Sequence, residues 1–256
     1  MNFETPHRLI FSRILTRWFN KLPSDGLILE IGCGLGSWIG LCIKNGYKII
    51  GLDNDEQACS IASSQFGRVS KGIVLYSGNI FPFESNSIQG VLAHEVLEHV
   101  TEDKQFVAEA NRILEDGGLL ILTTPNGNRE PLDKRKHSAH VRHYVEEQLN
   151  SLLMEHGFTI EKRYWRMHPI CGLLDDALSR LGNELIQIQP IQPGLTYWRN
   201  DSQSRMVRFL LWVYKLIEPF IAFVVTIEFE IFKTILEARN IILIANKRTN
   251  IVSEGS

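Results

Sequence analysis

The sequence lacks several features that would assign it to a specialised class of protein. Its four cysteines include neither a C-x-x-C pair nor the spacing of a zinc site, so a reducing cytoplasm is the expected compartment. The formal net charge is only −2, which offers no broad positive field for nucleic acid. Residues 1–23 carry charges throughout and contain no apolar core of a signal peptide. These absences predict an intracellular protein that does not act on nucleic acid.

Long uninterrupted apolar runs are also missing. Residues 206–237 are strongly apolar, but charged residues interrupt them too often for a membrane-spanning helix, which needs about 20 apolar residues. Hydrophobic residues make up 44% of the 256 residues, which is enough to bury one substantial core. A single α/β domain with insertions is therefore the expected organisation.

The most informative feature that is present is a glycine-rich turn directly after an apolar strand. Residues 28–36 read ILEIGCGLG, with Gly32, Gly34 and Gly36 in the turn. Glycine takes backbone angles that are closed to other residues, and without a Cβ it lets a ligand lie against the main chain. The helix expected over about 37–44 presents free N–H groups to whatever sits in this turn. The segment predicts a nucleotide-cofactor loop, and the alternative is an ordinary strand-to-helix turn.

A second strand supports the cofactor interpretation. Residues 47–53 read YKIIGLD and end in Asp53, about 20 positions after Gly32. A carboxylate at this place, at the end of the second strand, accepts hydrogen bonds from a ribose diol. Strand, glycine loop, helix, strand and acid together predict a nucleoside site.

The glycine spacing indicates which nucleoside. The dinucleotide fingerprint is G-x-G-x-x-G, whereas here the third glycine comes one residue early, which disfavours an NAD-linked oxidoreductase. The pattern G-x-G-x-G, with Glu30 two residues before the first glycine, resembles motif I of class I S-adenosylmethionine (SAM)-dependent methyltransferases. The resemblance implies SAM as the cofactor. The residues it places around the cofactor in this region are Glu30, Gly32, Cys33, Gly34, Gly36, Asp53 and Asn54.

The resemblance also implies an adenine contact after the third strand. The family usually has an aspartate there that accepts from the adenine amino group, and the next backbone N–H contacts a ring nitrogen. This sequence has Asn79 and Ile80 at these positions, and the Asn79 carbonyl oxygen can still accept. The alternative is a polar turn residue that simply follows a strand.

Strands and helices alternate along the chain in the order that builds a parallel sheet. A helix is expected from about 54 to 66, and residues 96–114 are expected to be mostly helical. Further strands are expected over 72–76, 87–93, 119–123, 158–165 and 240–247. The resemblance implies an α/β, Rossmann-like, seven-stranded mixed sheet with helices on both faces and an antiparallel last strand.

Residues 94–100 read HEVLEHV and follow the fourth strand, at the carboxyl edge of the sheet where ligands bind. The segment resembles the E-V-L-E-H-V motif of the ubiquinone-biosynthesis O-methyltransferases. In a helix starting near Glu95, the side chains of Glu95, Glu98 and His99 would share one face. This face could hold a divalent ion, as the resemblance allows, but a polar helix face is favoured, so no metal is predicted. His94 and Glu95 are expected to contact the cofactor, and His94 also the acceptor.

A second histidine cluster follows the fifth strand. The resemblance places the segment H-x-R-H-Y, residues 140–144, over the active site. Methyl transfer to a hydroxyl needs alignment and a base, and histidine changes its charge near neutral pH. His140 and His143 are the candidate bases, joined by His94 as a catalytic candidate, and Arg142 and Tyr144 are the candidates for positioning the substrate. The alternative is a solvated basic loop whose histidines hydrogen-bond locally.

The expected domain organisation has four parts. Residues 1–24 form an amphipathic helix, a lid in which Trp18 contacts substrate, and residues 25–165 form the SAM-binding core. Residues 166–238 are an apolar, helical insert whose first part is irregular, and residues 239–256 supply the last strand and a tail. The apolar face of the insert needs a cover, which could be the protein's own sheet, a second subunit, a greasy substrate or the membrane interface.

These patterns predict a SAM-dependent methyltransferase that transfers a methyl group to oxygen on a lipid, quinone, sugar or other small molecule. Nothing resembling the Asn-Pro-Pro-Tyr signature of base amino-methylating enzymes follows the fourth strand. A homodimer and peripheral contact with the inner face of the membrane are further hypotheses. The alternative function is a non-catalytic SAM-binding or interaction subunit whose apolar helices hold a partner.

Overall fold

The structure is a computed structural model that describes residues 5–133, 139–174, 176–177 and 205–249. The chain divides into two compact units. The larger comprises Leu15–Tyr164 and Asn240–Ser256, and the smaller comprises Met1–Ile14 and Trp165–Arg239. The expected irregular first part of the insert falls mostly on residues 178–204, which lie outside the described residues.

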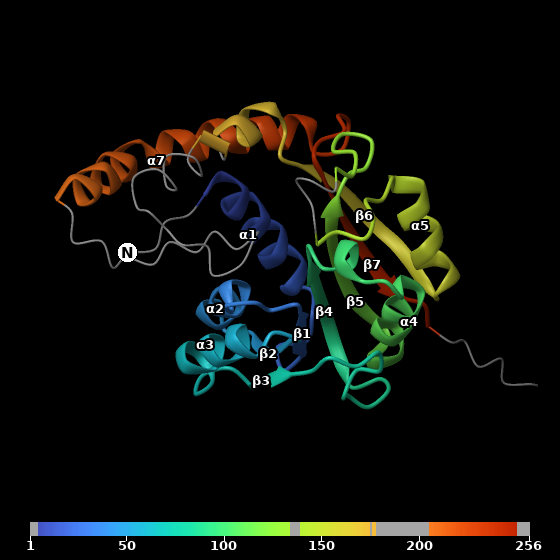
Figure 1. Cartoon of the computed structure of the whole chain (residues 1–256). Coiled ribbons are helices and arrows are strands. Elements are labelled where there is room, and N and C mark those ends of the chain that lie inside the picture. The colour runs from blue at the N-terminus through green and yellow to red at the C-terminus, as the bar shows by residue number, and fades with distance from the viewer. Residues whose placement is uncertain (1–4, 134–138, 175, 178–204, 250–256) are drawn as a thin grey trace, which may run out of the picture. The chain divides into compact units, whose positions relative to one another are not determined.

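A seven-stranded mixed sheet forms the larger unit, in the order β3-β2-β1-β4-β5-β7-β6 (Figure 1). The strands are β1 (Leu27–Ile31), β2 (Lys48–Asp53), β3 (Gly72–Leu75), β4 (Ile88–His94), β5 (Leu114–Pro125), β6 (Phe158–Arg166) and β7 (Asn240–Lys247). Strands β1 to β5 pair in parallel, and β7 is antiparallel to β5. The predicted fold class is therefore confirmed.

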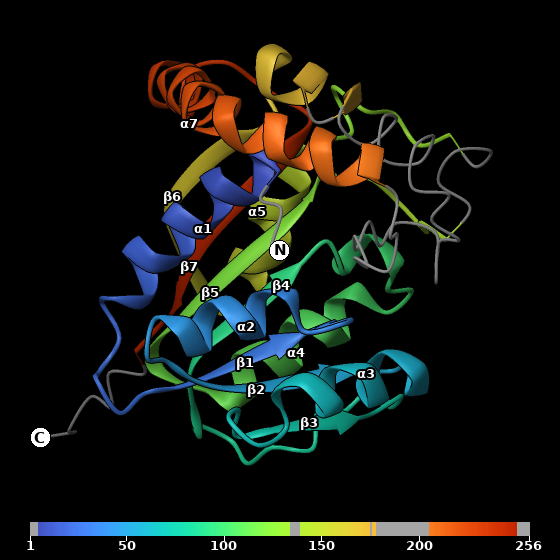
Figure 2. The same cartoon turned by 90° about the vertical axis from the view of Figure 1, so that its left-hand side faces the viewer.

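Helices cover both faces of this sheet. Figures 1 and 2 show α2 (Ser37–Lys44) and α3 (Glu56–Phe66) on one face and α4 (Asp103–Ile113) and α5 (Glu146–Glu155) on the other. The central strands are buried on both faces, which explains why they read as nearly continuous apolar runs. Leu29, Val91 and Ile121, for example, are completely buried. The helix α3 is capped by Asp55, whose side chain accepts from the Ala58 N–H, so it begins two residues later than expected.

Residues 96–114 are mostly helical, as expected, but no α-helix begins near Glu95. Glu95 has a positive φ of 53°, and only a single 3-10 turn, η1 (Leu97–His99), follows before α4. The reason is a contact that the sequence pattern does not reveal: the Glu95 N–H donates to the carbonyl and the hydroxyl of Thr123 on β5, which turns the chain at the end of β4. Glu95, Glu98 and His99 therefore do not share a helix face.

The smaller unit contains the first part of α1 (Pro6–Phe19), a short helix from residue 169, and α7 (Arg205–Phe232). The long helical pattern expected after residue 206 is confirmed, and Pro219 lies inside α7. Buried Glu228 accepts from the N–H groups of Ile170 and Cys171, so a carboxylate stabilises the N-terminus of the short helix. Among the described residues, no helix is both long and apolar enough to cross a membrane.

His168 of the smaller unit gives a pH-dependent stability. Its side chain is only 1% exposed and packs against Phe232, and burial lowers its pKa below the usual value of 6.5, although Glu228 acts in the opposite direction. The folded state thus binds fewer protons than the unfolded state, so stability present above about pH 6.5 is lost as the pH falls. We expect the free energy of unfolding to decrease between about pH 7.5 and pH 5.5 more steeply in the wild type than in His168→Gln, by at most about 1.4 kcal/mol per pH unit. The free energies are measured by chemical denaturation at each pH. The same pH dependence in the wild type and in His168→Gln would contradict the expectation.

Candidate functional site

The candidate site lies at the carboxyl ends of β1, β2 and β4. The chain passes from β1 to β2 on one side and later returns to β4 on the other side of β1. Open α/β sheets bind ligands at such a switch in strand order, because the connections diverge and leave a crevice there. The predicted cofactor loop and the segment after β4 both begin at this edge.

Close packing explains the glycines of the loop between β1 and α2. Gly32, Gly34 and Gly36 have φ values of 72°, 50° and 81°, which side chains rarely adopt. A Cβ on Gly32 would lie 2.4 Å from Cγ2 of Val96, and one on Gly36 would lie 2.7 Å from the ring of Phe66. The loop is therefore a bare backbone turn that ends at the N-terminus of α2.

Asp53 faces this loop from the end of β2. Its Oδ2 accepts from the Gly34 N–H at 2.7 Å, and its Oδ1 accepts from the Asp55 N–H at 2.9 Å. A carboxylate offers about four lone-pair sites, so two acceptor positions remain for a ribose diol. The two strand ends and the glycine loop thus meet where the sequence places the nucleoside, and Asn54 beside Asp53 is exposed.

Two other residues predicted to bind the cofactor, one at the end of β1 and one in the loop, have buried side chains. Glu30 and Cys33 are 1% and 4% exposed. Burial, reinforced by the charges of Glu30 and Asp53, raises the pKa of the Cys33 thiol far above its usual range. Because the thiolate is the reactive form, Cys33 is not a nucleophile and can serve the site only through its backbone and packing.

The predicted adenine contact lies in an exposed turn after β3. Asn79 and Ile80 are both exposed, and the Ile80 N–H donates to the hydroxyl of Tyr76 at 3.0 Å. Tyr76 was not predicted from the sequence, although an aromatic residue at the end of a strand beside a ligand loop is a usable signal. Adenine contact by Asn79 and Ile80 stays a prediction.

His94 ends β4, and its ring contacts Trp38 of α2, the helix that follows the cofactor loop. The two rings meet edge to face at a centroid distance of 5.1 Å. Its Nδ1 lies 2.7 Å from the hydroxyl of Thr123 on the neighbouring strand. The Thr123 hydroxyl donates to Oε1 of Glu95 at 2.7 Å, and Asn240 donates to Oε2 at 3.0 Å. The side chain of Glu95, predicted to contact cofactor, is thus held by β5 and β7.

Glu98 is a second carboxyl group in this region and is 1% exposed. Burial, followed by the negative charge of Glu95, raises the pKa of Glu98 well above its usual range, although the Thr124 hydroxyl donates to it at 3.3 Å. Two adjacent carboxyl groups resist being charged together. Both effects therefore favour the neutral form of the Glu98 carboxyl group.

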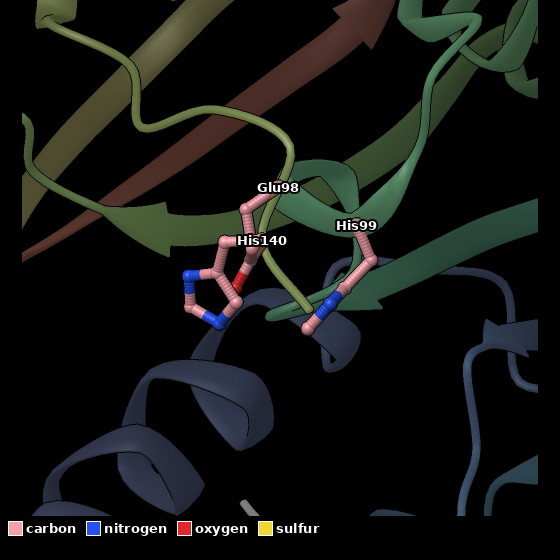
Figure 3. A group of neighbouring side chains, drawn as sticks. All are labelled: Glu98, His99 and His140. Atoms are coloured by element: carbon pink, nitrogen blue, oxygen red, sulfur yellow. The ribbon is translucent and has the colours of Figure 1, made fainter. Parts of the chain in front are cut away.

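Glu98, His99 and His140 come together from η1 and from the loop after β5 (Figure 3). One ligand atom of each lies within 4.8 Å of the others. Two histidines and a carboxylate can hold a divalent ion such as Zn²⁺ or Mn²⁺. His140 thus occupies the third place in the group that the sequence had assigned to Glu95.

The prediction of a metal-free site is tested by removal of metal. We expect the methyl transfer predicted from the sequence to survive dialysis against a chelator, because in-line displacement at a methyl group needs alignment rather than a Lewis acid. Activity is measured with and without added Mn²⁺ or Zn²⁺. A loss that either ion restores, and that His99→Ala makes permanent, would replace the prediction by a metal site on these three residues.

His140 and His143 form a hydrogen-bonded pair. Nδ1 of His143 lies 2.5 Å from the Glu130 carbonyl oxygen, which can only accept, and its Nε2 lies 2.7 Å from Nδ1 of His140. A neutral His143 therefore accepts from His140, whose lone pair is then on Nε2. Of the two predicted bases, His143 thus positions the ring of His140.

Arg142 and Tyr144 converge on Asp103, the first residue of α4. Arg142 pairs with Oδ2 of Asp103 at 2.5 Å, and the Tyr144 hydroxyl donates to the same oxygen at 2.8 Å. Burial and this hydrogen bond raise the pKa of Tyr144. Asp103 was not predicted, because its partners lie far away in the sequence. The arrangement anchors the loop that carries His140, and contact of Arg142 and Tyr144 with substrate stays a prediction.

Trp18, predicted to contact substrate, is 4% exposed. Its indole N–H donates to the Tyr164 hydroxyl at 3.3 Å, and the Lys21 ammonium lies 3.7 Å from the ring centroid. These contacts make Trp18 a packing residue at the end of α1. No observation supports a substrate contact, which stays a prediction.

The fold and the glycine loop define a nucleoside-binding α/β protein, and comparison with known proteins agrees. Residues 29–122 match the model of a methyltransferase domain family. A probable SAM-dependent methyltransferase of Mycolicibacterium smegmatis is 30% identical over 192 residues, which are 72% of this chain and 68% of that protein. A ubiquinone biosynthesis O-methyltransferase of Rhodopseudomonas palustris is 30% identical over 135 residues, covering 48% of this chain and 52% of that protein.

The fold is also found in solved structures. Phosphoethanolamine N-methyltransferase 2 of Haemonchus contortus, solved in complex with SAM, has a TM-score of 0.66 and 16% identity, over 97% of this chain and 54% of that chain. This likeness concerns the fold alone. The Mycolicibacterium smegmatis relative is 30% identical and is matched over 68% of its length. The chain therefore belongs to the SAM-dependent methyltransferases.

SAM is therefore the cofactor, and the residues present fit it. The bare turn at Gly32, Gly34 and Gly36 admits a ligand to the main chain, and Asp53 has lone pairs for the ribose. No phosphate has to be neutralised, which agrees with the lack of a basic side chain among residues 30–38 of the loop.

Proposed function

We propose that the protein transfers the methyl group of SAM to a hydroxyl oxygen of a small-molecule acceptor. One observation carries this proposal: His94, held through Nδ1 by Thr123, stands at the end of β4 beside α2, which begins at the cofactor loop. A histidine so placed can take the proton of an acceptor hydroxyl next to the bound cofactor. Among the described residues, His140 is a second candidate, since its Nδ1 is held by His143.

The chain's own residues supply binding, alignment and a base. SAM, when bound, supplies an activated methyl group on a sulfonium. The main chain at Gly32 to Gly36 and the carboxylate of Asp53 hold the nucleoside part, and Asn79 and Ile80 face the adenine. Nε2 of His94 or of His140 takes the hydroxyl proton, and Arg142 and Tyr144 border the acceptor. Proximity provides most of the acceleration, because the displacement is in line.

A lipid, quinone or sugar acceptor is proposed. The support for an apolar acceptor is twofold: one relative is a ubiquinone biosynthesis O-methyltransferase, and α7 exposes large apolar side chains. These include Trp212, Leu216, Phe220, Phe223 and Ile227. The same surface suits peripheral contact of a cytoplasmic protein with the inner face of the membrane, or a homodimer. Flotation with anionic liposomes tests the membrane proposal, and absence from the lipid fraction would argue against it.

The alternative is a SAM-binding or interaction subunit without catalysis. The observation that favours this alternative is the set of exposed apolar side chains on α7, which could bind a protein partner. It predicts binding of SAM with no formation of S-adenosylhomocysteine (SAH) in the presence of any acceptor. The catalytic proposal predicts equimolar SAH and methylated product.

Transfer of a labelled methyl group from SAM to lipid, quinol and sugar acceptors separates the two functions. We expect His94→Asn to lower the turnover number by about 10² to 10⁴, as for loss of a general base. His140→Asn is measured in parallel, because it distinguishes the two candidate bases. His156→Asn is the matched control: Nδ1 of His156 bonds the Leu152 carbonyl at the end of α5, away from the sheet edge. Full activity of both His94→Asn and His140→Asn would remove the base from the proposal.

A further inference from the structure

A chain of hydrogen bonds leads from His94 into the sheet. It joins Nδ1 of His94 to Oγ1 of Thr123 at 2.7 Å, and Oγ1 of Thr123 to Oε1 of Glu95 at 2.7 Å. Thr123 is completely buried in β5, where it pairs with His94 in the parallel register. A buried hydroxyl in an otherwise apolar strand costs free energy unless it is fully hydrogen-bonded.

The donors and acceptors in this chain can be assigned. A carboxylate only accepts, so the single proton of the Thr123 hydroxyl is donated to Glu95. The same hydroxyl oxygen accepts from the Glu95 N–H at 3.1 Å, and it can only accept from His94. Nδ1 of His94 therefore carries a proton, and the lone pair of the neutral ring is on Nε2.

Further contacts hold the Glu95 side chain as the acceptor of the Thr123 hydroxyl. Its second oxygen accepts from the Asn240 amide N–H at 3.0 Å. The positive φ of Glu95, at 53°, is a conformation that a non-glycine residue adopts at a cost. Hydrogen bonds thus fix the Glu95 backbone at Thr123 and its two carboxylate oxygens at Thr123 and Asn240.

We propose that Thr123 and Glu95 are positioning residues that fix His94 as the Nδ1–H tautomer, leave the lone pair of the neutral ring on Nε2, and stabilise the imidazolium once Nε2 has taken a proton. The inference rests on the proposed function, because it names the groups that support its base. The acceptor hydroxyl gives its proton to Nε2, and its oxygen would bond the methyl carbon as the carbon–sulfur bond of the sulfonium breaks, with SAH as the neutral leaving group. The imidazolium later returns the proton to water. Thr123 and Glu95 touch neither the acceptor nor the methyl group.

Nitrogen NMR of histidine-labelled protein tests the tautomer without any need for activity. We expect the ring nitrogens of His94, identified by their loss in His94→Asn, to report Nδ1–H in the wild type and in Thr123→Ser, which keeps the hydroxyl. In Thr123→Val the signals should shift toward a mixture of tautomers. Thr124→Val is the matched control, because the neighbouring Thr124 bonds Glu98 and should leave the His94 signals in place.

Activity gives a second readout. Thr123→Val should lower the turnover number by about tenfold with an unchanged KM for SAM, and Thr123→Ser should restore it. Unfolding curves identify any variant that has simply lost its fold, and in that case the wild-type spectrum alone decides. A wild-type His94 with its proton on Nε2, or the same tautomer in Thr123→Val and the wild type, would overturn the inference. The expected tautomers without any turnover would leave the hydrogen-bond chain intact and would contradict the proposed function instead.

Discussion

Replacement of Asp53 by alanine should abolish measurable binding of SAM and SAH. The Asp53 carboxylate accepts from the Gly34 N–H at 2.7 Å and has two further acceptor positions for a ribose diol. Hydrogen bonds to a charged group contribute about 1.5–3 kcal/mol each, so loss of two of them to a ribose diol weakens binding by at least about 100-fold. Calorimetric titration measures the affinity of the wild type and the variant.

Asp55→Ala is the control for that experiment. Asp55 lies two residues further along and caps α3 through the Ala58 N–H at 2.8 Å. Loss of such a cap costs about 1 kcal/mol of stability, so this variant should be less stable but should bind SAM normally. Equal affinities of Asp53→Ala and Asp55→Ala would show that Asp53 does not bind the ribose.

A methyl group on Gly32 should both destabilise the protein and weaken SAM binding. The residue has a φ of 72°, and a Cβ there would lie 2.4 Å from Val96. The left-handed conformation costs about 1–2 kcal/mol for an alanine, and overpacking adds about 1–3 kcal/mol. Because Val96 belongs to the segment after β4, relief of the collision must move either that segment or the cofactor loop. Chemical denaturation and SAH titration measure the two effects.

Gly46→Ala separates backbone strain from the collision. Gly46 has a similar φ of 82°, but no heavy atom lies within 4 Å of the position of its Cβ. It follows α2 at the end remote from the loop. The variant should therefore lose only the stability that backbone strain costs, about 1–2 kcal/mol, and should keep its SAH affinity. If Gly46→Ala and Gly32→Ala lost the same stability and bound SAH equally well, packing of the loop against Val96 would have no role.

Local patterns were sufficient to predict the strands and the glycine turn, whereas the family resemblance supplied the seven-stranded mixed sheet and its antiparallel last strand. Strands β1 and β2 are short apolar runs bounded by turn residues, and three glycines at fixed spacing have few alternatives to a tight turn. Asp53 was predictable because the length of the connecting helix fixes its distance from Gly32. These features depend on neighbours along the chain, and therefore the sequence alone reveals them.

The side-chain network at the site could not be predicted in the same way. Thr123, Asp103 and Asn240 act on partners that are remote in sequence, and the non-helical turn at Glu95 exists because β5 supplies its hydrogen bonds. The helix pattern placed Glu98 beside His99 but missed His140, which joins them from the loop after β5. Two polar residues at the end of an otherwise apolar strand, Thr123 and Thr124, were the available signal.

The central claim is that the loop between β1 and α2 binds SAM, and calorimetric titration of the wild-type protein tests it most directly. SAM, SAH and NADH are titrated separately into the same preparation. The structure predicts saturable binding of SAM and SAH, mutual competition between them, and no binding of NADH. Binding of NADH, or no binding of either adenosyl ligand to a folded sample, would contradict it.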